Sequence, residues 1–153
     1  MNPNIIAGLI NRAYNNFDMF SFENRLKLQK FTYIMQGFFG LNIGYEFNWY
    51  HYGPYCMELT RDAFNVTFSE IPKLKFSEET SEKKFIPFLE LIKGKDNDWL
   101  EIASSIHFLK KLGLSKEKII ETIKNKRGDF NKREKEINKI YEDILGFLKW
   151  VMN

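Results

Sequence analysis

Two stretches decide how this chain folds, RLKLQKFTYI at residues 25–34 and YHYGPYCMEL at residues 50–59. The first is typical of a helix, because Leu28 begins a series of apolar residues at helical spacing. The second contains Gly53-Pro54, and a proline pushes the residue before it out of the helical region. We therefore expect a strand to end at this glycine and a new helix to begin with Pro54 in its first turn. Neither stretch is a catalytic motif.

Capping residues and apolar residues at helical spacing predict further helices on both sides of these stretches. Ser21 and Ser115 are expected N-caps, because a serine side chain accepts a hydrogen bond from the first turn. Gly40 and Gly113 are expected stops, because glycine ends helices readily. The expected helices cover about residues 3–13, 21–40, 54–66, 96–113 and 115–127, and a last one carries Ile137 to Leu148.

The segments between these helices show shorter apolar periods. Residues 43–50 alternate apolar and polar side chains, which is the pattern of a half-buried strand. Residues 68–86 are compatible with a β-hairpin, because two alternating runs flank a polar turn. Pro87 and Gly94 then bracket a short apolar turn.

Together these elements predict a mainly α (α+β) fold. Their order is that of a winged-helix domain, with residues 68–86 as the wing, followed by further helices. We expect a single domain over residues 1–153, made of a winged-helix-like part with a small β element at 1–94 and a helical extension at 95–153.

Composition excludes several classes of protein. The chain has 153 residues, 44% hydrophobic and 16% aromatic, which suits one folded domain and not a disordered chain. Cys56 is the only cysteine, so no intramolecular disulfide can form, and two histidines argue against zinc; we expect no metal and no cofactor. The chain has no apolar run of 18 residues and no signal-peptide pattern, so we expect a cytoplasmic protein without a membrane span.

Positive charge is concentrated late in the chain. Residues 110–139 hold 11 Lys and Arg against 5 Asp and Glu, whereas the whole chain has a net charge of +3. Such a segment suits a phosphate-facing surface, although a solvated pair of amphipathic helices has the same composition. The candidate nucleic-acid contacts are Lys124, Lys126, Arg127, Lys132 and Arg133, with Lys73 and Lys75 from the possible wing.

The helix that would enter the major groove is poorly charged for that task. The segment from Tyr55 to Val66 carries Glu58 and Asp62 against Arg61, and phosphate repels a net negative helix. A protein partner suits such a helix better, and a run of aromatic residues offers anchors for one, unless the core takes them up. These aromatic residues are Phe38, Phe39, Tyr45, Phe47, Trp49, Tyr50 and Tyr52.

A catalytic role has little support in the residues. Cys56 and His51 flank the Gly53-Pro54 corner and are the one imaginable nucleophile–base pair, but no third residue orients them. No glycine-rich phosphate loop and no Gly-x-Ser-x-Gly motif occurs. We therefore predict no catalytic residues and a protein that is not an enzyme.

The two opening stretches resemble the YwgA-like family of small uncharacterised proteins, which combines an Arg-x-Lys-Leu-Gln-Lys helix with a Tyr-Gly-Pro-Tyr corner. More distantly, they are similar to the Panacea or SocA-like domain of antitoxins and prophage-encoded proteins. That likeness implies a non-enzymatic role, in which the domain neutralises a toxin or bridges a client protein to another factor. The motif residues are Arg25, Leu28, Gln29, Lys30, Tyr52, Gly53, Pro54 and Tyr55.

The residues leave open what the motif does. Gln29 and Lys30 either hold the helix to the corner or face a ligand, and the backbone N–H groups after Gly53 either serve the corner or receive an anion. We expect a regulatory or protein-interaction module whose partner is another protein, and a homodimer is compatible with this. Nucleic-acid binding through residues 110–139 is the alternative, and a small enzyme using Cys56 and His51 is a more remote one.

Overall fold

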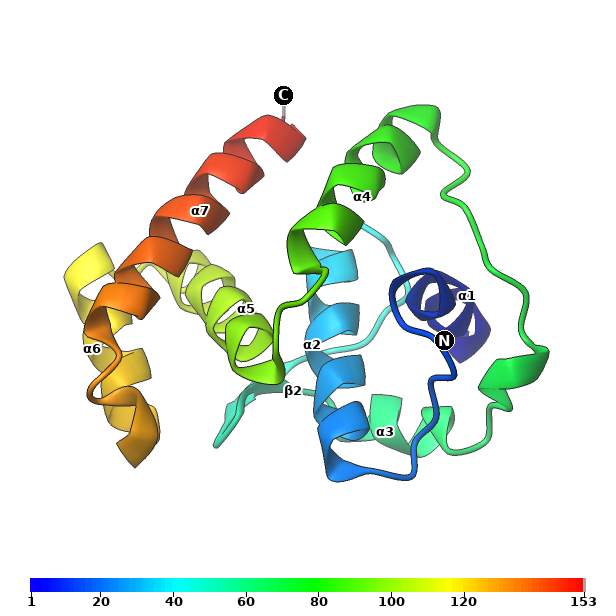
Figure 1. Ribbon diagram of the computed structural model, residues 1–153, viewed down its shortest axis with the longest axis horizontal. Coiled ribbons are helices and arrows are strands. Elements are labelled where there is room, and N and C mark those ends of the chain that lie inside the picture. The colour runs from blue at the N-terminus through cyan, green and yellow to red at the C-terminus, as the bar shows by residue number, and fades with distance from the viewer. Residues whose placement is uncertain (153) are drawn as a thin grey trace.

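The computed structural model describes residues 1–152, and for Met152 the backbone alone (Figure 1). Over this range the chain is mainly helical and contains one small antiparallel sheet, which confirms the predicted mainly α class with a small β element. The elements are α1 (Pro3–Ala13), α2 (Phe22–Gly37), β1 (Asn48–Tyr50), β2 (Gly53–Tyr55), α3 (Met57–Ala63), η1 (Phe68–Glu70), α4 (Glu79–Ile92), α5 (Asn97–Lys111), α6 (Lys116–Lys126), η2 (Gly128–Phe130) and α7 (Glu134–Met152), where η marks a 3₁₀ helix.

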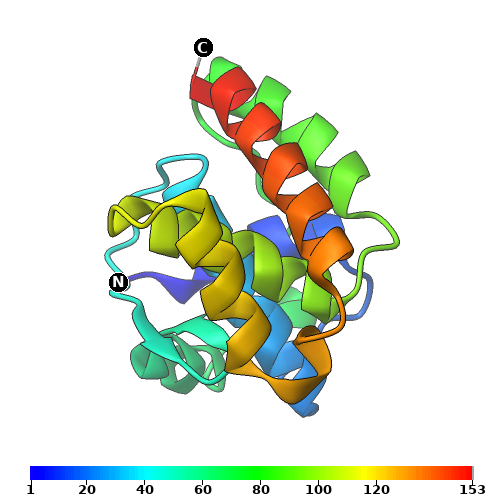
Figure 2. The ribbon, with the colours of Figure 1, turned by 90° about the vertical axis from the view of Figure 1, so that its left-hand side faces the viewer.

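Helix α5 lies at the centre of the molecule. It packs against α2 and β2 on one side and against α6 and α7 on the other (Figures 1 and 2). Almost its whole middle section is buried, including the polar residues Glu101, Ser104 and Ser105. A helix section that is buried all round can present polar side chains only to other protein groups. The polar residues of this middle section therefore face other parts of the fold, whereas Lys110 and Lys111 at the end of α5 are exposed.

The helix caps expected from the sequence are present. The Ser21 side chain accepts a hydrogen bond from the backbone N–H of Asn24 at 3.0 Å, and the Ser115 side chain accepts one from Lys118 at 3.2 Å. Asp96 does the same for Trp99 at 2.9 Å. Each cap satisfies a backbone donor that has no partner within its helix, which is why these starts can be predicted locally.

The hairpin predicted for residues 68–86 is wrong. The chain instead forms η1, then an extended segment, and then α4. The extended segment lies alongside α1, and its Leu74 N–H donates to the Gly8 carbonyl at 3.0 Å. Phe85, Phe88 and Ile92 recur at helical spacing in α4 and are all buried. This apolar face decides the conformation, and Pro87 lies on the exposed side of the helix. The winged-helix order therefore lacks its wing.

The strand predicted for residues 43–50 is shorter than expected. Only Asn48–Tyr50 is a strand, and it pairs with Gly53–Tyr55, so that Trp49 lies opposite Pro54. The prediction that Pro54 opens a helix is wrong, because Pro54 is part of strand β2. The helix expected over residues 54–66 is instead α3, which begins at Met57 and ends at Ala63. The segment before β1 finds another partner, because the Gln36 side chain bonds both the N–H and the carbonyl of Tyr45, at 3.1 and 2.8 Å.

The β1–β2 hairpin rests directly on α5. Gly53 has a positive φ of 88°, and a Cβ at this position would lie 2.6 Å from the Ser105 hydroxyl oxygen. Glycine is therefore required here for two reasons, its left-handed backbone and the close approach of the two elements. Gly94 has a similar φ of 80°, but a Cβ there would meet no atom within 4 Å.

Replacing Gly53 by alanine should destabilise the protein more than replacing Gly94. Both substitutions impose left-handed strain of about 1–2 kcal/mol, and Gly53→Ala adds overpacking of about 1–3 kcal/mol against Ser105. Urea unfolding of the two variants measures the difference. Equal losses of unfolding free energy would show that the hairpin does not press on α5.

Candidate functional site

Gln29 joins α2 to the corner between β2 and α3. Its side-chain amide donates to the Cys56 carbonyl and to the Thr60 hydroxyl, both at 2.7 Å, and accepts from the Cys56 N–H at 2.8 Å. One amide thus satisfies both backbone groups of Cys56, which have no strand partner on that side. Gln29 is fully buried, with 0% of its surface exposed. Its contacts hold the corner in place.

Lys30, the next residue of α2, makes a parallel contact. Its ammonium group donates to the Pro54 carbonyl at 2.7 Å, and the residue is 1% exposed. We call the side chains of Gln29 and Lys30 with the backbone of residues 54–56 the buried clasp. Because it has no access to solvent, it serves the fold and leaves no room for a ligand. Of the two roles left open by the sequence, the geometry supports the structural one.

A carboxylate on α5 compensates the buried charge of Lys30. Glu101 lies near Lys30 and forms an ion pair with Lys126 of α6, and Arg127 follows with a nitrogen 3.4 Å from the Glu101 carboxylate. Burial lowers the pKa of Lys30 to about 7, which the negative charge of Glu101 opposes and the positive charge of Lys126 assists. Burial also lowers the pKa of Lys126. At the centre of the protein, Lys30, Lys126 and Arg127 therefore surround the Glu101 carboxylate.

The other motif residues surround the buried clasp. Leu28 is in the core, and the Tyr55 hydroxyl lies 3.1 Å from the Thr60 hydroxyl. Tyr52 packs its ring against Phe22 and under the Arg127 guanidinium group. Arg25 reaches backwards and donates to the carbonyls of Met19 and Phe20, at 2.9 and 3.2 Å, which fixes the loop before α2.

Most of the residues predicted to contact nucleic acid form ion pairs within the protein. Lys124 pairs with Glu134 at 3.1 Å, and Asp98 on α5 receives both Arg127 at 3.0 Å and Arg133 at 2.7 Å. Arg127 and Arg133 also lie over the Phe130 ring. The charge count over residues 110–139 could not reveal the pairs with α5, because Asp98 and Glu101 precede that segment.

Of the three remaining candidates, Lys132 belongs to the basic segment, whereas Lys73 and Lys75 lie far from it. Lys73, Lys75 and Lys132 are exposed, and none of them has an ion pair in the part of the chain that the structure describes. In Figure 1 the segment between η1 and α4, which carries Lys73 and Lys75, lies at the opposite end of the molecule from α6. The predicted basic residues are thus divided between two ends.

Cys56 and His51 are not brought together. His51 lies in the exposed turn of the hairpin, whereas Cys56 follows the far end of β2 and is buried. Among residues 1–152 no group of three or more His, Cys, Asp or Glu is placed to hold a metal ion. No helix in this range has an apolar stretch long enough to cross a membrane.

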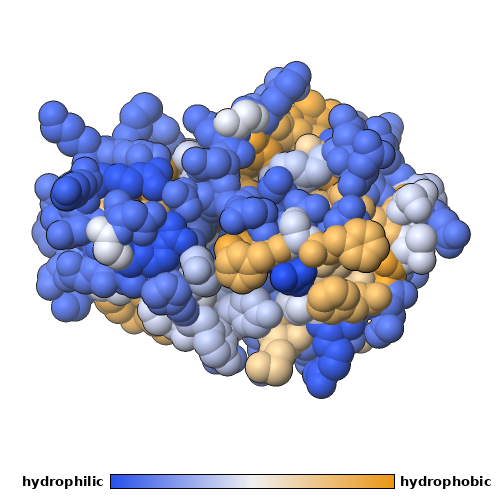
Figure 3. Space-filling model, turned by 60° about the horizontal axis from the view of Figure 1, so that its bottom comes forward, coloured by the Kyte–Doolittle hydropathy of each residue, from blue (hydrophilic) through white to orange (hydrophobic). Residues whose placement is uncertain are grey.

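The aromatic run singled out in the sequence mostly serves the core. Phe38 and Tyr45 are buried, Phe39, Phe47, Trp49 and Tyr52 are partly buried, and only Tyr50 is exposed. The large apolar side chains that do reach solvent near the corner come from other positions, which the sequence pattern missed. We call Phe20, Phe22, Met57 and Phe64 the apolar face. Figure 3 shows hydrophobic residues gathered on the side where the start of α2 and α3 lie.

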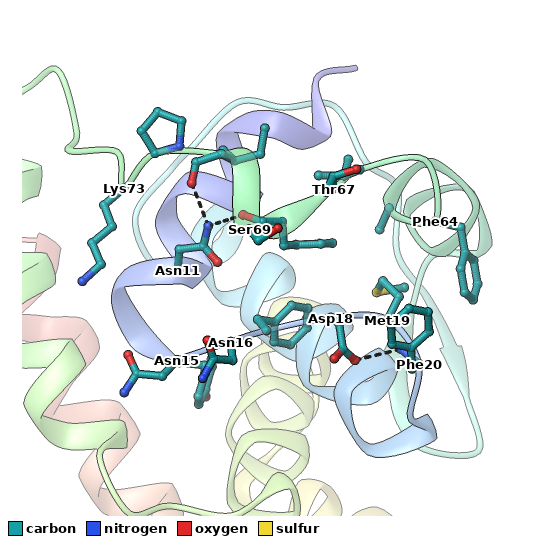
Figure 4. Close-up of a pocket in the computed structure, with 17 residues that line it drawn as sticks. Asn11, Asn15, Asn16, Asp18, Met19, Phe20, Phe64, Thr67, Ser69 and Lys73 are labelled. Atoms are coloured by element: carbon teal, nitrogen blue, oxygen red, sulfur yellow. Dashed lines mark hydrogen bonds between the residues drawn. The ribbon is translucent and has the colours of Figure 1, made fainter.

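A hollow adjoins this face. It has a volume of about 810 Å³ and lies between the segment that joins α1 to α2 and the segment that runs from the end of α3 past η1; we call it the loop pocket. Figure 4 shows Phe20 and Phe64 on the same side of it, each from one of the two segments. Asn11 holds the far wall, since its amide donates to the carbonyls of Phe68 and Ile71 at 2.9 and 3.0 Å.

Comparisons of the chain with protein-family models, with curated proteins and with solved structures gave no match. The resemblances to the YwgA-like and Panacea or SocA-like families therefore stay predictions. The function has to be argued from the surfaces that this fold presents.

Replacing Gln29 by leucine should lower the free energy of unfolding by about 2–4 kcal/mol, because two buried backbone groups of Cys56 lose their partner. Gln36→Leu is the matched control. It removes the same kind of backbone pairing at Tyr45, but the Gln36 side chain is itself only partly buried, so water can replace the amide. Urea unfolding compares the two; a loss at Gln29 no larger than that at Gln36 would contradict the central role of the buried clasp.

The lowered pKa of Lys30 predicts a pH dependence of stability. Between about pH 7 and 10.5 the unfolded chain binds a proton at this lysine that the folded chain does not, so stability rises with pH in this window. The contribution of one such group cannot exceed about 1.4 kcal/mol per pH unit. Lys30→Met should flatten the rise between pH 7 and 9, while Lys132→Met, at an exposed site, should keep it. Identical slopes in wild type and Lys30→Met would contradict the shift.

Proposed function

We propose that the protein is a non-enzymatic interaction module that binds another protein through the apolar face and the adjoining loop pocket. The observation that carries this proposal is the exposure of two phenylalanines on one side of a hollow. Phe20 is 89% exposed and Phe64 is 57% exposed. Large aromatic side chains that stand in water around a concave surface are typical anchors of protein interfaces.

The position of these side chains favours a macromolecule over a small ligand. Small-molecule sites enclose their aromatic residues inside the cavity. Here Phe20 and Phe64 line the pocket and are still exposed, and the likewise exposed Phe22 and Met57 begin helices α2 and α3. A partner that covers the rim as well as the hollow removes Phe20 and Phe64 from water.

The charge of this surface favours protein over nucleic acid. Asp18 and Lys73 are the charged side chains that line the loop pocket, and the other polar residues there are amides and hydroxyls. Helix α3 adds Glu58, Arg61 and Asp62, of which Asp62 accepts a hydrogen bond from Tyr45 at 2.9 Å. A surface without net positive charge gains little from phosphate. It suits a partner segment with large apolar side chains and uncharged polar flanks.

A rigid loop is what such an interface needs. The two carbonyl contacts of Arg25 hold Met19 and Phe20 in place before α2 begins. A preorganised anchor loses less conformational freedom on binding. The antitoxin-type resemblance fits this proposal, since neutralising a toxin or bridging a client requires such a surface. A cytoplasmic location is part of the same proposal.

The Phe20→Ser/Phe64→Ser double variant should stay folded and lose its partner, because both changes are on the surface and remove the anchors. Ile86→Ser/Leu112→Ser is the matched control, since these residues are similarly exposed but lie on α4 and beyond α5. The measurement is stoichiometric co-purification from cells of the source organism, followed by calorimetry with the purified partner. We expect wild type and control to bind and the double variant to lose at least about tenfold in affinity.

Two outcomes would overturn the proposal. One is a partner that binds the Phe20/Phe64 variant as tightly as wild type. The other is a homodimer, seen by sedimentation in wild type and broken in the double variant, which would show that the apolar face binds a second copy of the chain.

A further inference from the structure

A second hollow lies at the other end of α2, away from the loop pocket. It has a volume of about 900 Å³ and lies between the ends of α2, α5 and α7 and the start of α4. Figure 2 shows α7 beside α4 at the top of the view, and the Lys84 ammonium group donates to the Val151 carbonyl across them. This volume is in the range of small-molecule sites. We call it the lysine-rimmed pocket.

The floor of this pocket is apolar. Phe38, Phe39, Leu145 and Leu148 line it, and Phe38 belongs to the core. The Phe39 ring contacts the rings of Phe88 at 5.4 Å and Phe147 at 6.1 Å between centroids, so the floor is part of a packed aromatic cluster. A ligand that binds here must therefore bury an apolar body.

The rim carries an excess of positive charge. Among the residues that the structure describes, four lysines line the pocket against one carboxylate, that of Glu78. Lys110, Lys111 and Lys149 are exposed, and within residues 1–152 none of the three forms an ion pair. The fourth is Lys84. A low-dielectric floor strengthens the attraction of such a rim for an anion that binds partly buried.

One further polar group lines the pocket without adding charge. His107 lies 2.7 Å from the Tyr33 hydroxyl through its Nδ1 atom. Burial, with the nearby charge of Lys111, lowers the pKa of His107 to about 4, so the ring is neutral at neutral pH. The positive charge of the rim thus comes from the lysines alone.

We propose that the lysine-rimmed pocket binds a small hydrophobic carboxylate, with its apolar body on the Phe39 floor and its carboxylate among the lysines. The complementarity of an apolar floor and a cationic rim selects an amphipathic anion. The volume accommodates a medium-length alkyl or aryl-alkyl chain. This site is separate from the apolar face and does not depend on it.

Calorimetric titration with decanoate, below its micelle concentration, tests the proposal on the full chain. Decanol and decyltrimethylammonium are matched probes with the same alkyl body but no charge or the opposite charge. Decanoate should bind more tightly than decanol, decyltrimethylammonium should not bind, and added salt should weaken the binding of decanoate. No heat with decanoate, or equal affinity for decanoate and decanol, would overturn the proposal.

Charge reversal locates the site. Lys110→Glu/Lys149→Glu should weaken decanoate binding by at least about tenfold, because two attractive charges become repulsive. Lys73→Glu/Lys75→Glu, the matched control near the loop pocket, should stay within about twofold of wild type. Phe20→Ser/Phe64→Ser should bind decanoate as wild type does, which separates this proposal from the proposed protein interface. Unchanged binding in the Lys110/Lys149 variant, with its fold checked by circular dichroism, would overturn the assignment.

Discussion

The structure depends on the need to pair three backbone groups that the β2–α3 corner buries. The carbonyl of Pro54 and both groups of Cys56 form their hydrogen bonds with side chains of α2. An unpaired buried carbonyl or N–H is costly, so α2 has to supply side chains of the right reach and polarity. A glutamine can donate and accept at once, and a lysine can reach a single carbonyl. Gln29 and Lys30 meet these two requirements at successive positions.

That solution has an electrostatic cost, which shapes the second half of the molecule. A buried ammonium group requires a nearby anion, and Glu101 on α5 meets this need. Glu101 in turn draws Lys126 and Arg127 inwards, and Asp98, one turn earlier, holds Arg127 and Arg133. Three residues of the positive segment, Lys126, Arg127 and Arg133, are therefore the counter-charge of α5. The composition of the segment is the one expected for a phosphate-binding surface, but these three charges serve the fold.

The sequence predicts those features that neighbouring residues determine. The caps at Ser21 and Ser115 could be found because their hydrogen-bond partners are local, and the centre of the fold could be found because its residues belong to one motif. The helix α4 was missed, since Pro87 is a sign of a break and only contacts with distant phenylalanines show that its apolar face is buried. The exposure of Phe20 could not be foreseen for the same reason. The exposure of Phe20 depends on how the loop before α2 packs, and the residue type alone does not reveal this packing.

The candidate surfaces lie at the two ends of α2, and the buried clasp lies between them. The loop that carries Phe20 leads into the helix, and Phe38 and Phe39 follow its last residue. A 16-residue helix spans about 24 Å, so a small carboxylate in the lysine-rimmed pocket cannot touch the apolar face. It could act there only by shifting α2, and a shift would break the bonds of Gln29 and Lys30 together. Because these bonds are buried and have no water to replace them, we expect each surface to bind its occupant independently of the other.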